Sequence, residues 1–157
     1  MKIKVLIVLG AAIAAFVWLH GQRAKFHEKM GGAASVAWLT DAPAAFARAA
    51  KENKPVLMDF TGSDWCGWCQ RLDKEVFSTV AFATYAKKNL ILLKVDFPRS
   101  LKQTDSEKQQ NQALGAKYRI EGYPTLVLVR ADGTERGRLG YQPGGPDPWL
   151  AALDKLH

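Results

Sequence analysis

The sequence predicts an α/β domain in which a mixed central sheet is flanked by helices, preceded by an N-terminal apolar segment. Three observations carry this prediction. Short apolar runs typical of buried strands alternate with helical stretches from residue 36 onward. An Asp-Gly turn at Asp132-Gly133 joins the last two strand-like runs into an antiparallel hairpin, which makes the sheet mixed. The 157 residues, less the apolar segment, leave room for one domain with a single core.

Residues 1–22 have the pattern of a signal peptide or an N-terminal membrane anchor. An uncharged apolar run covers residues 5–19 and follows two lysines, as in a secretory signal. Ile3 extends the run toward the length of a spanning helix, so residues 3–19 could anchor the protein in the inner membrane. No small-x-small cleavage site follows Leu19 closely, which favours an uncleaved anchor over a removed signal. Basic residues flank the run on both sides and fix no orientation.

A polar, glycine-rich linker is expected over residues 23–34 and the domain over residues 35–157. The net charge of +7 is unevenly placed. Five basic residues and one acid lie in the first 29 residues, so the rest of the chain carries only +3. Because no basic stripe with interleaved aromatics is visible, the charge indicates a membrane-flanking segment and a solvated surface, and not a nucleic-acid partner.

The domain is expected to begin with a short strand, Val36-Ala37-Trp38. A helix over residues 42–51 follows, capped by Asp41 and with a proline in its first turn. Residues 56–60 then form the central strand, apolar on both faces as in a sheet covered by helices. Asp59 interrupts this run, and a carboxylate buried there should have a raised pKa.

The central strand leads through a short polar turn into Cys66-Gly67-Trp68-Cys69, which opens a helical segment reaching Phe77. The positive end of a helix stabilises a thiolate, so Cys66 should ionise more readily than a free thiol and act as the nucleophile. Cys69 lies one helical turn on and can reach back to a mixed disulfide at Cys66. We expect Cys66 to be the exposed sulfur and Cys69 to face the helix packing.

A cysteine pair at this spacing has two other possible uses. A zinc site needs two further ligands, but the chain has no other cysteine and His20, His27 and His157 lie outside the expected core. A purely structural disulfide across a two-residue gap would constrain the unfolded chain little. A redox site is therefore the favoured interpretation.

The remaining elements follow from apolar periodicity and turn signals. The polar loop at residues 98–108 is read as a tolerated insertion in preference to a recognition feature. Lys94 and Asp96 suggest an ordinary salt-bridged strand edge. The last helix is expected to be capped by Asp147. The expected elements are helices from Ser78 or Thr79 to residue 88 and over 105–118, strands over 90–97, 126–130 and 135–139, a loop at 143–146 and a last helix from Pro148 with Trp149, Leu150 and Leu153 facing the sheet.

The order of strand, Asp, turn, Trp-Cys-x-x-Cys and helix, followed by Gly-Tyr-Pro-Thr at 122–125 and an apolar run, resembles the thioredoxin superfamily. The resemblance covers roughly residues 35–157. It is strongest to exported bacterial thioredoxin-like proteins similar to the C-terminal domain of the transmembrane thiol:disulfide interchange protein. It implies a thioredoxin-like fold.

The resemblance implies that Asp59 helps to move the proton of Cys69. In the alternative interpretation, Asp59 lies at the end of its strand and its carboxylate caps the following turn. The approach from Asp59 to Cys66 is one residue longer than in simple thioredoxins. Some members carry a lysine near the buried acid, but counting along residues 90–97 places Leu92 there, so that role is not transferred.

The resemblance also implies a substrate surface around the sulfurs. Pro124 matches the family's cis-proline, which would leave the backbone edge of Tyr123 free to pair with an extended client segment. A trans proline that merely starts the strand is the alternative. Trp65, Gly67 and Trp68 would complete the surface, although packing alone could also explain Trp65.

The sequence therefore predicts an exported thiol:disulfide oxidoreductase of the periplasm or cell envelope. Its resemblance to anchored reductants implies a reductase of client disulfides in preference to an oxidase or isomerase. It needs no cofactor beyond the redox-active disulfide Cys66–Cys69 and no metal. Its expected partners are client proteins with disulfides, a regenerating thiol:disulfide protein and, if the N-terminal segment is retained, the membrane; a monomer is expected. The alternatives are a copper-binding metallochaperone, which usually adds a distant His, and a redox-silent adaptor.

Overall fold

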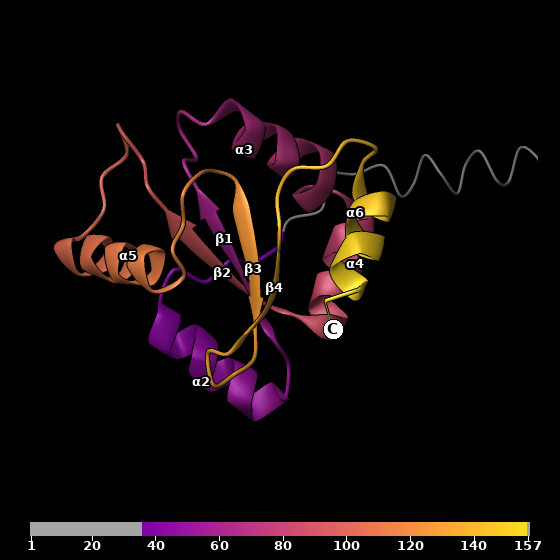
Figure 1. Ribbon diagram of the computed structural model, residues 1–157, viewed down its shortest axis with the longest axis horizontal. Helices are drawn as coiled ribbons and strands as arrows, with labels where there is room; N and C mark the ends of the chain where they lie inside the picture. Colours follow the sequence, from indigo (N-terminus) through magenta and orange to yellow (C-terminus); the bar gives the residue numbers. More distant parts are fainter. Residues whose placement is uncertain (1–35, 157) are drawn as a thin grey trace, which may run out of the picture. The chain divides into compact units, whose positions relative to one another are not determined.

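A four-stranded sheet with helices on both faces forms the fold (Figure 1). The computed structural model describes residues 36–156. In chain order the elements are α2 (Ala42–Glu52), β1 (Val56–Thr61), α3 (Gly67–Leu72), the π-helical η1 (Asp73–Phe77), α4 (Val80–Asn89), β2 (Ile91–Asp96), α5 (Asp105–Lys117), β3 (Thr125–Val129), β4 (Glu135–Leu139) and α6 (Pro146–Asp154).

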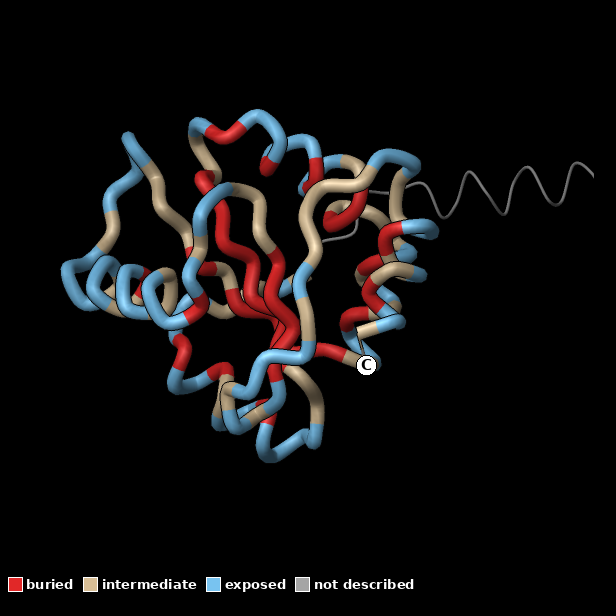
Figure 2. The backbone as a smooth tube through the Cα atoms, viewed as in Figure 1, coloured by how far each residue is buried: buried red, intermediate tan, exposed pale blue. Residues whose placement is uncertain are grey.

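The sheet has the strand order β2-β1-β3-β4. β1 runs parallel to β2 and antiparallel to β3, and β3 pairs antiparallel with β4, so the predicted mixed sheet is confirmed. All six residues of β1 are buried, as expected of a strand paired on both edges and covered on both faces (Figure 2). The predicted Asp-Gly turn is also present, with Gly133 at φ 83°, where a residue without Cβ is favoured.

The alternation of side chains along β1 divides the core into two halves. Val56, Met58 and Phe60 pack on the side of α2 and α5, whereas Leu57 packs on the side of α3, α4 and α6. Because Asp59 follows Leu57 by two residues, it faces the same side as the helix that carries the cysteines. The Asp59 carboxylate therefore points from the sheet toward α3.

The expected first strand at Val36–Trp38 is wrong. Pairing is limited to an isolated parallel bridge between Leu39 and Leu93, with Leu39 N–H donating to Leu92 O at 2.9 Å. The chain then turns at once into α2, whose N-cap Asp41 accepts from Ala44 N–H at 2.8 Å. The start of α2 directly after this bridge leaves no room for a strand beyond Thr40, and Val36–Trp38 themselves make no strand pairing.

Two helix ends also differ from expectation. The last helix begins at Pro146, with Gly145 as its N-cap, so Asp147 lies inside the first turn and is not the cap. A proline fits the first helical position because its missing N–H is not needed there. The helix that starts at the cysteines does reach Phe77, but its final turn is π-helical, with Ser78 N–H donating to Asp73 O at 2.8 Å.

The predicted signal or anchor (1–22) and linker (23–34) lie outside the described residues. Within residues 36–156, no helix combines the length and the apolar character that crossing a bilayer requires.

Trp149 is the largest fully buried side chain of the α3–α4–α6 half of the core. Its ring meets Phe77 edge-on at a centroid distance of 5.6 Å, and its Nε1 donates to Gly140 O at 3.1 Å. We expect Trp149→Ala to lower the free energy of unfolding by about 3–5 kcal/mol, because it leaves a cavity and an unpaired carbonyl. Denaturant unfolding measures this. Trp68→Ala, at a half-exposed site, should cost about 1 kcal/mol or less; equal losses in both variants would contradict the packing described.

Candidate active site

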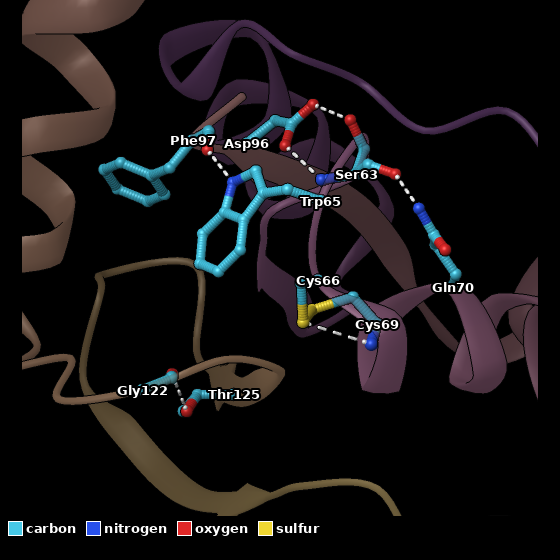
Figure 3. The surroundings of a disulfide bond; sticks show 9 residues. All are labelled: Ser63, Trp65, Cys66, Cys69, Gln70, Asp96, Phe97, Gly122 and Thr125. Carbon is cyan, nitrogen blue, oxygen red and sulfur yellow. Dashed lines mark hydrogen bonds between the residues drawn. A yellow bond between two sulfur atoms is a disulfide. The ribbon is translucent and has the colours of Figure 1, made fainter. Parts of the chain in front are cut away.

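The two cysteines form a disulfide at the N-terminus of α3, with their Cα atoms 5.2 Å apart (Figure 3). Cys66 is the N-cap of the helix, and its Sγ accepts a hydrogen bond from the N–H of Cys69 at 3.2 Å. A sulfur in this position occupies the place usually taken by a capping oxygen, where free N–H groups point at it. The helix end can therefore stabilise negative charge on Cys66 once the disulfide is reduced.

The expected difference in exposure between the sulfurs is small in this oxidised form. Cys66 is 7% exposed and Cys69 is 5% exposed. What separates the two cysteines is their surroundings: Cys66 caps the helix, whereas Cys69 lines a polar cavity that also holds Asp59.

A hydrogen-bond network fixes the turn that leads into the cysteines. Asp96, at the end of β2, accepts from Ser63 N–H at 2.9 Å and from Ser63 Oγ at 2.5 Å. Gln70 Nε2 on α3 donates back to Ser63 O at 3.2 Å (Figure 3). Gly62 is required here, because a Cβ on it would lie 2.4 Å from the Trp65 ring. The turn is thus tied both to the sheet and to the helix.

Asp59 and Lys94 face each other across β1 and β2. The two residues are direct register partners, and both line a cavity of about 170 Å³ together with Cys69, Asp73 and Gln70. Leu92, to which counting assigned the family's lysine position, is instead the partner of Leu57, two residues away. That assignment is wrong. Among the ion pairs of residues 36–156 there is also none between Lys94 and Asp96, since Asp96 binds Ser63.

Burial dominates the electrostatics of Asp59. Loss of water raises its pKa to about 7; Lys94 opposes the shift, and Asp73 and Asp96 add to it. Its Oδ1 is buried and has no hydrogen-bond partner among the described residues, so this oxygen caps no turn. A carboxyl group that exchanges its proton near neutral pH beside the second cysteine suits proton transfer.

The Tyr123–Pro124 peptide bond is cis, as the resemblance implied. Thr125 Oγ1 donates to Gly122 O at 2.8 Å and closes this turn, which faces the disulfide in Figure 3. The Tyr123 ring packs edge-on against Trp65 at 5.8 Å. A groove of about 760 Å³ starts at Pro124 and Thr125 and continues along Leu139 and Gly140.

Trp68, between the cysteines, is 56% exposed and lies beside Tyr141 at a centroid distance of 5.1 Å. The Arg71 guanidinium lies 5.6 Å from the Trp68 ring and 5.2 Å from the Tyr141 ring. Glu75 binds both Arg71 Nε, at 2.7 Å, and the Tyr141 hydroxyl, at 2.7 Å. No motif marked Arg71, Glu75 or Tyr141, because only folding brings the chain after β4 next to α3.

Residues 42–157 match the family model described as a thioredoxin-like domain. The chain belongs to this family. The matched range contains both cysteines, Asp59, Lys94 and the cis-proline, so each part of the described site lies inside the domain that defines the family.

Two relatives carry the comparison further. The "Disulfide bond reductase DsbH" of Chlamydia pneumoniae is 36% identical over 121 residues, which cover 77% of this chain and 72% of that protein. A solved structure titled "DsbH Oxidoreductase" has a TM-score of 0.75 at 32% identity and covers 80% of this chain and 86% of that one. The protein is accordingly a thiol:disulfide oxidoreductase of the thioredoxin superfamily.

The oxidised C-terminal domain of DsbD from Neisseria meningitidis has a TM-score of 0.56 at 23% identity, covering 77% of this chain and all of that one. At this identity the likeness extends to the fold alone.

Asp59→Asn should remove a pH dependence of stability. A raised pKa in the folded state stabilises the fold fully below the unfolded value near 4, and this contribution is lost as pH rises through about 7. We expect Asp59→Asn to raise the free energy of unfolding at pH 8 by about 2–4 kcal/mol and to change it little at pH 4. Denaturant unfolding at several pH values checks this, with exposed Asp105→Asn as the matched control. A difference that does not grow with pH contradicts the burial argument.

The two charges nearest the buried acid should act in opposite directions. Lys94→Gln should raise the pKa of Asp59 and Asp73→Asn should lower it, because the first removes an attraction for the carboxylate and the second a repulsion. Carboxyl ¹³C shifts of Asp59 during an NMR titration report the pKa directly. Lys88→Gln on the exposed face of α4 is the control; shifts of equal sign for Lys94→Gln and Asp73→Asn would rule out the arrangement.

Proposed function

We propose that the protein is a reductase of client protein disulfides in the cell envelope, with Cys66 as its nucleophile. The Cys66 thiolate attacks one sulfur of a client disulfide, forms a mixed disulfide and releases the first client thiol. Cys69 then attacks the Cys66 sulfur, which forms the Cys66–Cys69 disulfide and releases the second client thiol. Two electrons pass from the dithiol to the client.

The observation that carries this proposal is the different surroundings of the two sulfurs. The Cys66 Sγ receives the N–H of Cys69 at the helix N-terminus, which favours its thiolate at rest. Cys69 shares a cavity with Asp59, whose pKa near 7 lets it take the Cys69 proton during the second step. Lys94, the register partner of Asp59, favours the ionised carboxylate that accepts this proton.

The client segment is proposed to bind across the cis-proline turn. Pro124 offers no N–H that could compete at the sulfurs, and the backbone of Tyr123 remains available for an added strand. Trp65, Gly67 and Trp68 form the rim of this site; Gly67 has no neighbour within 4 Å of where a Cβ would stand, which leaves room for the client backbone.

The proposed function includes a location in the cell envelope and a second thiol:disulfide protein as partner. The name of the Chlamydia pneumoniae relative supports reduction as the net direction. The apolar N-terminal run supports export and tethering in the inner membrane or secretion into the periplasm. A second thiol:disulfide protein must return two electrons to the Cys66–Cys69 disulfide after each cycle, since the protein uses no other cofactor; it acts as a monomer.

Cys69→Ser tests the proposal, because it removes the second step but keeps the first. Reduced Cys69→Ser protein should accumulate covalent adducts with disulfide-containing proteins of an envelope extract, visible on non-reducing gels and released by a thiol reagent. Cys66→Ser is the matched control and should form few adducts, since Cys69 does not occupy the helix N-cap position that favours the thiolate of Cys66. Stronger trapping by Cys66→Ser would reverse the assigned roles, and equal trapping by both variants would contradict a difference between the two sulfurs. A complete lack of adducts would instead favour a redox-silent adaptor.

A further inference from the structure

The loop between β2 and α5 is attached to the active site by the two residues that precede Cys66. Asp64 accepts hydrogen bonds from the backbone N–H groups of Arg99 at 3.0 Å, Ser100 at 2.6 Å and Leu101 at 3.2 Å. Trp65 Nε1 donates to Phe97 O at 2.8 Å (Figure 3). In Figure 1 this loop rises at the end of the sheet where α3 begins. Its attachment distinguishes it from a merely tolerated insertion.

The loop adds an apolar group to the surface around the disulfide. Three large apolar side chains are exposed among residues 36–156: Trp65 at 36%, Trp68 at 56% and Leu101 at 59%. The first two flank Cys66, and the third belongs to the loop that Asp64 holds. Leu101 and Trp65 thus offer exposed apolar groups on the loop side of the disulfide, and exposed apolar groups that lie together favour protein binding.

The same loop brings a positive charge to that surface. The Arg99 guanidinium lies 4.1 Å from the centroid of the Trp65 ring. Neither Arg99 nor Lys102 takes part in an ion pair within the described part of the chain. The Asp64 carboxylate is occupied by three backbone N–H groups, which also lower its pKa. Stacking on Trp65 limits the motion of Arg99, so binding an anion costs it little further conformational entropy.

The opposite rim of the disulfide lacks such a free charge. Arg71, beside Trp68, is paired with Glu75 at 2.7 Å. The surface is therefore asymmetric: aromatic and charge-balanced toward Tyr141, and cationic with an exposed leucine toward the loop. A partner that approaches the disulfide meets the two sides in a fixed order, because the cis-proline turn sets the direction of its backbone.

We propose that Arg99 and Leu101 select clients whose disulfide-bearing segment places an acidic residue and an apolar residue beside the reacting cysteine. The acidic side chain pairs with Arg99, and the apolar side chain covers Leu101 and the edge of Trp65. This inference rests on the proposed reductase function and adds to it the chemistry of the preferred client. Charge pairs at the rim of an interface act mainly on the association rate, so the selection should appear in the rate of attack at low salt.

The test uses two synthetic peptides with the same intramolecular disulfide, which differ only in an Asp-Leu or a Lys-Leu pair beside one cysteine. Stopped-flow tryptophan fluorescence of the fully reduced protein gives the second-order rate constant for each. We expect the wild type to favour the acidic peptide by about tenfold at low ionic strength, with the ratio falling toward one as salt is added. Arg99→Glu should reverse the preference, and Arg99→Gln should abolish it.

Arg130→Glu, at an exposed position on the distant β3–β4 turn, changes the net charge equally and is the matched control. It should keep the wild-type ratio; a ratio that follows net charge in both variants would overturn the proposal, as would an unchanged ratio in Arg99→Glu. The rate with a neutral small-molecule disulfide distinguishes a failure of the reductase function from a failure of the client selection. Failure to reduce any disulfide would refute the reductase function, whereas reduction without peptide preference would refute only the selection.

Discussion

The pairing of β1 with β2 is the constraint on which the site depends. Their parallel register sets Asp59 opposite Lys94, and the alternation of side chains along both strands turns this pair toward α3. A shift of one residue would turn Asp59 toward the apolar core under α2 and α5. The same register brings Asp96 to the turn before the cysteines, where its carboxylate holds Ser63. The cysteines, the buried Asp59 carboxylate and the supporting turn are thus aligned by one ladder of backbone hydrogen bonds.

Burying a carboxylate beneath an active helix is unfavourable, and the surroundings of Asp59 only partly compensate. Lys94 favours the ionised form, but burial and two other carboxylates favour the protonated one. The balance leaves the group near its point of half-protonation in neutral solution. A fully solvated carboxylate would be too weak a base to take a thiol proton, whereas an isolated buried one would stay protonated and could not accept it. The position of Asp59 between these limits suits the proton transfer that we propose for it.

The sequence allowed the main parts of this arrangement to be predicted, because they depend on local signals. The alternating apolar runs predicted the sheet and its helices, and the Cys-x-x-Cys spacing predicted the redox site. The cis form of Pro124 was implied by the resemblance to thioredoxins and not by a local signal. Contacts that depend on three-dimensional register were not accessible in the same way. Counting residues from the start of the expected strand over 90–97 placed the family's lysine position at Leu92 and missed Lys94. The residue opposite Asp59 is set by how β2 pairs with β1, which the count does not include. The cluster of Arg71, Glu75 and Tyr141 joins segments far apart in the chain. The expected first strand at Val36–Trp38 has local apolar character but no pairing partner beyond the isolated bridge at Leu39, which the sequence does not show.

The way in which the β2–α5 loop is attached has a consequence for how such proteins diversify. Asp64 binds three main-chain N–H groups and Trp65 binds a main-chain carbonyl, so these contacts use none of the loop's own side chains. The contacts that Asp64 and Trp65 make with the loop therefore do not depend on which side chains residues 97 and 99–101 carry. Substitutions at Arg99, Ser100 or Leu101 can alter what the rim presents while the scaffold and the thiol chemistry stay intact. Evolution can therefore change the surface that this short loop presents without rebuilding the contacts that Asp64 and Trp65 make with its backbone.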